Sequence, residues 1–287
     1  MIPGSFEYHR PGSVGETVEL LARLGEESRV IAGGHSLIPM MKLRLAVPEH
    51  LIDLQSVEGL KDIAIDGGDI TIGAMVTQHE LIESEALAAA CPILRETSKQ
   101  IADPQIRYCG TLGGNVANGD PGNDMPALMQ ALDADYLLAG PEGTRSIKAR
   151  DFYEAAYFTA LNEGEILTAV RFAAPSAGHG WAYEKQKRKI GDYATAAAAV
   201  LLTLSGGACS AASVALTNVA DTPLFAEEAS TILSGSSLDA DTVERAAKAA
   251  AAITDPAEDG RGPVEFRRHL TAVMVRRAVA TAQTRAA

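Results

Sequence analysis

The chain has 287 residues, of which 47% are hydrophobic and 22% charged, and its formal net charge at pH 7 is −12. This composition is that of a globular protein and excludes a disordered, collagen-like or coiled-coil chain. The acidic balance provides no basic stripe to neutralise phosphates, so a nucleic-acid-binding protein is excluded as well.

The sequence shows neither a membrane-spanning segment nor a secretory signal. The longest apolar run, Ala196–Leu202, is much shorter than the ~20 residues that cross a bilayer. The first ten residues contain no basic segment followed by an apolar one. We therefore expect a cytoplasmic protein with no transmembrane segment.

Residues 1–55 are predicted to form a small α/β unit. A stripe of Val18, Leu21 and Leu24 indicates an amphipathic helix. A short strand follows and stops at a Gly-Gly pair, and a second helix and strand complete the unit. The expected elements are a helix at 17–24, a strand at 29–32, a helix at 37–45 and a strand at 51–54.

The pattern changes in residues 56–177. Isoleucines alternate with polar or small residues on both sides of Asp66–Asp69 (DGGD), which is typical of a β-hairpin. A second glycine-rich loop is expected at 110–115. Helices are predicted at 78–90, 92–101 and 125–132, and strands at 136–139 and 166–172.

Ala173–Gly180 (AAPSAGHG) is the best candidate for a linker, since it holds one Pro, two Gly and no large apolar residue. Strands are predicted after it at 181–189, 194–204 and 212–219, and helices at 239–252 and beyond Pro263. In the last helix an apolar stripe is expected from residues four apart: Phe266, Leu270, Met274 and Ala278.

The sequence lacks several common catalytic and metal-binding motifs. The sequence has no G-x-G-x-x-G fingerprint, no Gly-Lys pair of a P-loop, no H-E-x-x-H helix and no G-x-S-x-G elbow. The three cysteines form no C-x-x-C pair, and the six histidines do not pair at ligand spacing. No metal site is therefore predicted, and the cysteines are interpreted as reduced, mostly buried thiols.

Two glycine pairs remain, in Ala32–Ser36 (AGGHS) and Thr111–Asn115 (TLGGN). Consecutive glycines can adopt positive φ and turn successive N–H groups toward one point, which binds phosphate oxygens without a cationic side chain. The first loop also leads into a helix N-terminus, whose dipole favours anions. Taken alone, each pair is more typical of an ordinary turn, but two such loops together make an anion site an equally good interpretation. The residues support a diphosphate ligand without naming it.

These two loops and Ile72–Thr77 (IGAMVT), in this order, resemble the FAD-binding subunits of molybdenum hydroxylases, the xanthine-dehydrogenase-like family. The resemblance covers essentially the whole chain. It implies an α+β fold, with a two-part FAD-binding domain of the vanillyl-alcohol-oxidase (PCMH) type at 1–55 and 56–177. A C-terminal α+β domain of the CO dehydrogenase flavoprotein type is implied at 178–287.

The resemblance implies that both loops hold the FAD and that His35 makes only a cofactor contact. Asp124 would bind ribose or adenine groups, although a helix N-cap is an equally good interpretation. Lys185 would stabilise negative charge near the flavin ring, or be one solvated member of a basic run. Tyr193 would cover the flavin ring, or its side chain would only pack against other residues of the chain. The implied cofactor-binding residues are Ala32, Gly33, Gly34, His35, Ser36, Ala102, Thr111, Leu112, Gly113, Gly114, Asn115, Asn118, Asp124, Lys185 and Tyr193.

Longer segments, among them IADPQIRYCGTLGGNVANGDPGNDMPALM, resemble in particular the flavoprotein (medium) subunits of aerobic carbon monoxide dehydrogenases. This implies a partner large molybdenum subunit, a small subunit with 2Fe–2S clusters, a dimer of heterotrimers, and a quinone-type acceptor, with the complex cytoplasmic or peripheral at the inner membrane face. The alternatives are a sister hydroxylase of aldehydes or N-heterocycles, a self-contained flavin oxidase, and a non-catalytic nucleotide-binding assembly protein.

Overall fold

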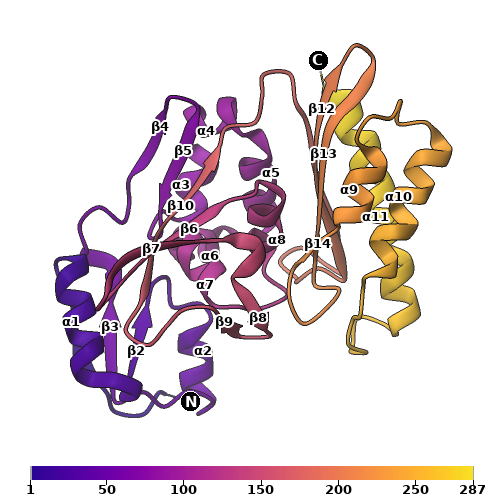
Figure 1. The fold of residues 1–287 in the computed structure, drawn as a ribbon. Coiled ribbons are helices and arrows are strands. Elements are labelled where there is room, and N and C mark those ends of the chain that lie inside the picture. The colour runs from indigo at the N-terminus through magenta and orange to yellow at the C-terminus, as the bar shows by residue number, and fades with distance from the viewer. Residues whose placement is uncertain (1, 287) are drawn as a thin grey trace.

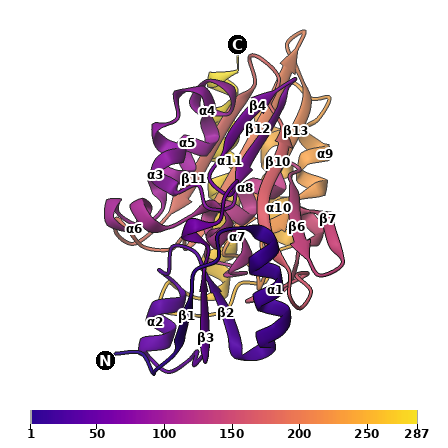
Figure 2. The same cartoon turned by 90° about the vertical axis from the view of Figure 1, so that its left-hand side faces the viewer.

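The computed structural model describes residues 2–286, which fold around three sheets and a small hairpin (Figure 1). The first sheet is parallel, in the order β1-β3-β2, and lies between two helices (Figure 2). The Ser13 side chain caps the first helix by accepting the N–H of Glu16. The elements are β1 (Glu7–His9), α1 (Val14–Leu24), β2 (Ser28–Ile31), α2 (Leu37–Lys42) and β3 (His50–Asp53).

The second sheet is antiparallel, in the order β4-β5-β10-β6-β7. Its strands are β4 (Ile63–Asp66), β5 (Asp69–Gly73), β6 (Asp135–Gly140), β7 (Gly143–Lys148) and β10 (Ile166–Ala173). Six helices follow β5: α3 (Gln78–Glu83), α4 (Glu85–Ala90), α5 (Pro92–Gln100), α6 (Pro104–Cys109), α7 (Leu112–Ala117) and α8 (Asp124–Ala131). A small hairpin, β8 (Tyr153–Ala155) and β9 (Phe158–Thr159), precedes β10.

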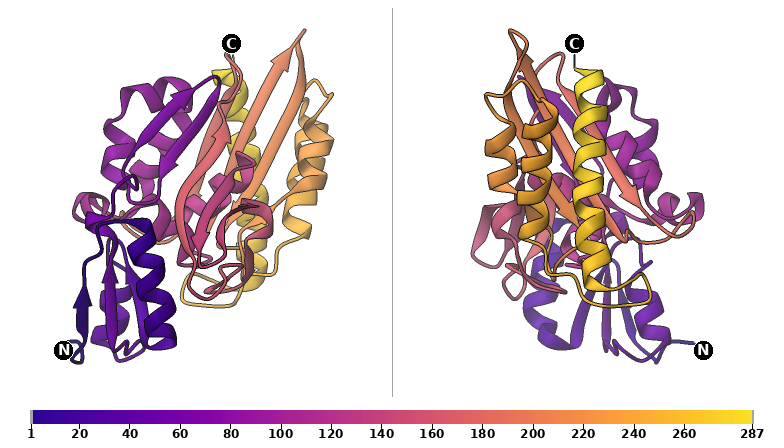
Figure 3. Two further views of the ribbon diagram at one scale, coloured as in Figure 1. Left: turned by 60° about the vertical axis from the view of Figure 1, so that its left-hand side comes forward. Right: turned by 90° about the vertical axis from the view of Figure 1, so that its right-hand side faces the viewer.

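The third sheet is antiparallel, in the order β11-β12-β13-β14, with three helices on one face (Figure 3, right). Its opposite face packs on α5 and α8 of the preceding part, so alternate alanines of β12 belong to two different cores. The elements are β11 (Gly180–Gln186), β12 (Ala196–Ser205), β13 (Ala208–Thr217), β14 (Leu224–Phe225), α9 (Glu227–Leu233), α10 (Ala240–Ala252) and α11 (Val264–Arg285).

The α+β fold and the hairpin at Asp66–Asp69 are confirmed. The predicted helix at 78–90 is broken because Ser84 caps a new helix, its hydroxyl accepting the N–H of Leu87. The helix predicted at 37–45 ends at Lys42, and Arg44 has a φ of 62°. Strands β1 and β7 and helices α6 and α9 were not anticipated. The boundaries at 55 and 177 stay predictions.

The apolar stripe predicted for the last helix is wrong at its first turn. Phe266 is 46% exposed, whereas the neighbouring Arg267 is buried. Arg267 is tolerated there because its guanidinium donates to the backbone carbonyls of Thr195, Asn218 and Ala257. The helix therefore buries a hydrogen-bonded cation where the spacing predicted an aromatic ring.

Candidate functional site

A cavity of about 640 Å³ is lined by residues from the N-terminal parallel sheet, the helices after β5, and the loop after β11. This volume lies within the ~300–1,000 Å³ typical of ligand pockets. Fourteen of the fifteen predicted residues line it. Leu112 is the exception, because its side chain is fully buried in the main hydrophobic core.

The loop Ala32–Ser36 offers free backbone donors to this cavity. Within residues 2–286, no protein acceptor receives the N–H groups of Gly33, Gly34, His35 or Ser36. Gly34 adopts a φ of +74°, the left-handed conformation that glycine tolerates. The loop leads into the N-terminus of α2, as predicted, and because α2 has only six residues its dipole is small. The loop itself can therefore bind an anion through its amides.

The second glycine pair was predicted to lie in a loop, but in the structure it lies in the first turn of α7. Thr111 caps this helix, its hydroxyl accepting the N–H of Gly114. The N–H groups of Leu112 and Gly113 donate to Val76 and Ala74 of the chain itself. Neither Gly113 nor Gly114 has a positive φ. This segment therefore forms a wall of the cavity, and its glycines are not a nest of free amides.

Close approach explains why glycine occupies both segments. A Cβ on Gly33 would lie 2.2 Å from the carbonyl oxygen of Cys109, and one on Gly113 would lie 2.5 Å from the Cβ of Ala74. A Cβ on Gly114 would lie 3.4 Å from that of Ala32, so the two motifs face each other. The first loop is thus pressed against the turn that leads into α7.

Lys185 and Asp124 form a buried ion pair beside the cavity. Lys185 Nζ lies 2.7 Å from Asp124 Oδ2, and the two side chains are 1% and 5% exposed. The Tyr183 hydroxyl donates to Asp124 Oδ1 at 2.6 Å. The interpretation of Lys185 as a solvated residue is therefore wrong. Asp124 is also not the N-cap, which is Asn123, and both its carboxylate oxygens already have partners.

Burial, and then the Asp124 carboxylate, raise the pKa of the Tyr183 phenol well above its ordinary value. The phenol therefore stays protonated and can only donate to Asp124. This arrangement holds the ammonium of Lys185 at the cavity wall, where it can stabilise negative charge on a ligand.

Tyr193, in the loop after β11, and Ala102, in the short connection between α5 and α6, both line the cavity. Tyr193 is 43% exposed, and the guanidinium carbon of Arg261 lies 5.8 Å from its ring centroid. Partial burial, followed by the Asp120 carboxylate, raises the pKa of the Tyr193 phenol. Ala102 has a φ of +44°, which is unusual for a residue with a Cβ and indicates local strain.

Two buried side-chain amides are suited to bind a ligand in the cavity. Asn118 Nδ2 and Gln78 Nε2 have no hydrogen-bond partner within the described residues, and both residues line the cavity. A buried donor without an acceptor is costly, so such groups mark places where a bound molecule supplies one. The free loop amides, these two donors and the Lys185 ammonium fit a cofactor with phosphate and carbonyl oxygens. Sequence reasoning missed Gln78, which belongs to no motif.

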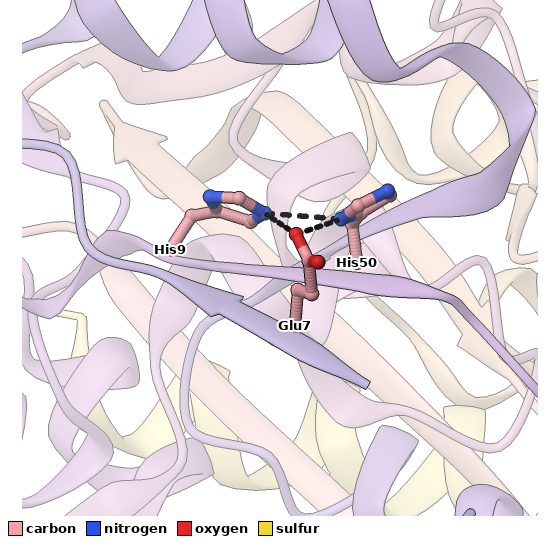
Figure 4. A group of neighbouring side chains, drawn as sticks. All are labelled: Glu7, His9 and His50. Carbon is pink, nitrogen blue, oxygen red and sulfur yellow. Dashed lines mark hydrogen bonds and ion pairs between the residues drawn. The ribbon is translucent and has the colours of Figure 1, made fainter. Parts of the chain in front are cut away.

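One side-chain group outside the cavity was not anticipated. Figure 4 shows Glu7, His9 and His50 converging, with His9 Nε2 3.1 Å from His50 Nδ1. Spacing along the sequence could not reveal this group, since no two of the six histidines stand at ligand spacing in the chain. These two are 41 residues apart in the chain and meet only because β1 pairs with β3.

Comparisons with known proteins identify the family of the chain. Residues 4–175 match the family described as the FAD binding domain in molybdopterin dehydrogenase, and residues 181–282 match the CO dehydrogenase flavoprotein C-terminal domain. The carbon monoxide dehydrogenase medium chain of Afipia carboxidovorans is 63% identical, covering 100% of this chain and 99% of its own. That of Hydrogenophaga pseudoflava is 48% identical over the full length of both chains.

Solved structures give the same result. A chain of the Cu,Mo-CO dehydrogenase superposes with a TM-score of 0.99 at 63% identity, with 100% of both chains covered. A chain of quinoline 2-oxidoreductase from Pseudomonas putida 86 gives 0.94 at 35% identity, again with both chains fully covered. No helix in residues 2–286 is long and apolar enough to span a membrane.

The family models, the relatives and the solved structures give one result. The chain belongs to the FAD-binding flavoprotein family of the molybdenum hydroxylases, in the group of the carbon monoxide dehydrogenase medium chains, which are oxidoreductase subunits.

Proposed function

We propose that this chain is the electron outlet of an aerobic carbon monoxide dehydrogenase. In this proposal a partner molybdenum subunit oxidises CO with water to CO₂. The electrons leave through 2Fe–2S clusters on a small subunit and the FAD of this chain, and reach a quinone-type acceptor. The observation that carries the proposal is the cavity, whose free amides fit FAD, in a chain 63% identical to a carbon monoxide dehydrogenase medium chain.

The residues of this chain would bind and tune the cofactor. The amides of Gly33–Ser36 would hold the diphosphate, and Asn118 and Gln78 would donate to oxygens along the cavity. Lys185, fixed by Asp124, would favour negative charge at its end of the cavity. When bound, FAD supplies a carrier that can exchange electrons one or two at a time.

The cysteines support the assignment of the iron–sulfur clusters to another chain. Cys91 and Cys209 are buried and Cys109 is exposed. Among residues 2–286, no group of His, Cys, Asp or Glu at metal-ligand distance contains a cysteine. Iron–sulfur clusters are held mainly by cysteine thiolates. The proposal therefore includes a small iron–sulfur subunit and a large molybdenum subunit, arranged as a dimer of heterotrimers.

Purification of the native complex tests the assembly and the cofactor. We expect three polypeptides and non-covalently bound FAD that acid extraction releases. A yellow chain that is active alone would indicate a self-contained flavin oxidase, and a colourless chain a nucleotide-binding assembly protein. A complex that oxidises an aldehyde or an N-heterocycle but not CO would indicate a sister hydroxylase.

Rapid mixing of CO with a flavin-depleted complex tests the outlet role. If this chain lies after the iron–sulfur clusters, CO should still bleach the cluster absorbance when FAD is absent, while reduction of the quinone should stop. The assignment is wrong if the subunits stay assembled without FAD and CO no longer reduces the clusters.

A further inference from the structure

Glu7, His9 and His50 project from one face of the N-terminal parallel sheet. Glu7 and His9 are two residues apart on β1, so their side chains point to the same face. His50 is the register partner of Glu7 on β3. Tyr8 points to the other face, where its hydroxyl contacts Asp53. The pairing of two strands therefore brings together three potential metal ligands from distant parts of the sequence.

The distances between the ligand atoms match those around a tetrahedral metal ion. His9 Nε2 and His50 Nδ1 are 3.1 Å apart, and Glu7 Oε2 lies 3.4 Å from the second and 4.0 Å from the first. Zinc binds nitrogen and oxygen at ~2.0–2.2 Å with tetrahedral geometry, which places neighbouring ligand atoms about 3.4 Å apart. One ion can therefore contact all three atoms after only small side-chain adjustments.

The burial of the three side chains fits a site that is open on one side. The histidine side chains are 22% and 17% exposed, whereas that of Glu7 is 73% exposed. The imidazoles are thus held by the sheet, and the carboxylate can close on an ion from solvent. Water can take the fourth position. Two imidazoles with one carboxylate suit a borderline divalent ion such as Zn²⁺ better than Mg²⁺ or Ca²⁺, which prefer oxygen ligands.

We propose that Glu7, His9 and His50 bind one divalent transition-metal ion of the zinc class, which fastens the edge strand β1 to β3. None of the three residues lines the large cavity. His50 pairs with Ser28, the first residue of β2, because β2 and β3 run parallel. The Ala32–Ser36 loop follows the last residue of β2 and therefore lies at the opposite end of this sheet. The site is therefore separate from the cofactor cavity. Its role is to stabilise a three-residue strand that pairs with β3 alone.

The competing interpretation is a hydrogen bond between the two imidazoles with Glu7 as a neighbouring acceptor. That interpretation needs no ion and predicts that added metal leaves the protein unchanged. The metal site predicts that binding requires all three side chains and stabilises the folded state, since the ion binds the folded chain in preference to the unfolded one.

The test is a calorimetric titration of Zn²⁺ into the full chain, in the assembly in which it purifies. Wild type is compared with His9→Ala, His50→Ala and Glu7→Gln, and with His269→Ala as a control at an exposed histidine of α11. The other metal sites of the assembly are common to all variants and cancel in the comparison. We expect one equivalent of Zn²⁺ more in wild type and His269→Ala than in His9→Ala or His50→Ala.

Loss of an outer-shell partner weakens metal binding by ~10–100-fold, and loss of a direct ligand should weaken Zn²⁺ binding by at least as much. Thermal unfolding is measured in parallel, and Zn²⁺ should raise the Tm of wild type and His269→Ala but not of the ligand variants. Glu7→Gln keeps the test valid if a histidine variant fails to fold, because Glu7 is exposed. Equal Zn²⁺ binding by wild type and Glu7→Gln, or no binding by wild type, would overturn the proposal.

Discussion

Lys185 and Asp124, 61 residues apart in the chain, form an ion pair in which Nζ lies 2.7 Å from Oδ2 and both side chains are almost completely buried. Lys185 Nζ also donates to the carbonyl oxygen of Gln100 at 3.3 Å. The pair thus joins β11 to the first turn of α8 and the end of α5. Burying two charges is costly, and the cost is balanced only while both partners remain.

Replacing one partner should therefore destabilise the protein strongly. We expect Lys185→Met to lower the free energy of unfolding by about 3–5 kcal/mol, because Asp124 is left as a buried, uncompensated charge. The double variant with Asp124→Leu should recover part of this loss. Lys61→Met, at an exposed position, should change stability by less than about 0.5 kcal/mol. Denaturant titration measures all four proteins, and a loss below 1 kcal/mol for Lys185→Met would contradict the prediction.

Gly33→Ala should disturb the first loop, because the added methyl group would clash with the backbone of the same chain. Its Cβ would lie 2.2 Å from the Cys109 carbonyl oxygen, so the loop or the turn before α7 must move. We expect a stability loss of about 1–3 kcal/mol and less than half of the wild-type flavin-to-protein absorbance ratio. Gly260→Ala is the matched control, because a Cβ there meets nothing within 4 Å. Full FAD content in Gly33→Ala would show that the loop does not hold the cofactor.

Asn118→Ala should separate cofactor binding from folding. Asn118 Nδ2 is buried without a partner in the described structure, so its removal deletes no protein hydrogen bond. We expect the free energy of unfolding without FAD to stay within about 0.5 kcal/mol of wild type. The Kd for FAD should rise roughly three- to tenfold, as for one lost hydrogen bond.

Flavin fluorescence quenching on flavin-depleted protein gives this Kd, with Asn162→Ala as a control at an exposed asparagine. If both asparagine variants bind FAD as wild type does, Asn118 is not a cofactor ligand.

Local patterns in the sequence predicted much of the fold, because isoleucines alternate around the hairpin at Asp66–Asp69 and β12 is a long, almost continuous apolar run. Residue spacing did not predict α7. Glycine favours loops, but the Thr111 cap and close packing on Ala74 stabilise a helix there. Local sequence patterns also do not reveal contacts between strands that are distant in the chain. The partners of Lys185, and the approach of His9 to His50, depend on tertiary pairing.

The cavity residues were found mainly because they belong to motifs. Gln78 belongs to none, and its importance follows only from its buried, unpaired amide. Leu112 shows the opposite case, since it lies inside a motif but its side chain belongs to the core. A motif therefore identifies the segment that forms a site, whereas the fold decides which of its side chains face the ligand.

Glu165, in the cavity wall, should make stability depend on acid pH. Arg145 donates to both its oxygens at 2.7 Å, and this hydrogen bonding lowers the pKa of Glu165 from 4.5 to about 2. A carboxylate with a lowered pKa stabilises the protein above its unfolded pKa, and this contribution is lost as pH falls from 4.5 toward 2. We expect this contribution to be about 2–3 kcal/mol at neutral pH, below the ~3.4 kcal/mol that a shift of this size corresponds to, because Arg145 is partly exposed to solvent.

Glu165→Gln provides the measurement, because the amide cannot titrate. The difference in unfolding free energy between wild type and Glu165→Gln should be constant from pH 6 to 8 and should shrink below pH 4.5. A difference that does not change with pH would mean that the carboxylate charge makes no contribution.

Tyr193 at the cavity should affect electron delivery to the external acceptor without affecting CO chemistry, if the proposed function holds. Its ring lies against Gly122, where an added Cβ would be 2.8 Å from Cδ1, and Arg261 lies above it. Tyr193→Ala removes the ring from the cavity, and we expect reduction of a quinone analogue to slow by up to about tenfold, a barrier change of about 1.4 kcal/mol. Tyr193→Phe keeps the ring and should retain most of the rate.

Stopped-flow spectroscopy on the holoenzyme separates the two steps. CO should bleach the iron–sulfur absorbance at the wild-type rate in Tyr193→Ala, while quinone reduction in the same sample is slow. Tyr108→Ala, at an exposed tyrosine that does not line the cavity, should match wild type in both steps. If Tyr193→Ala slowed cluster reduction as much as quinone reduction, the side chain would act before the flavin and not at its exit.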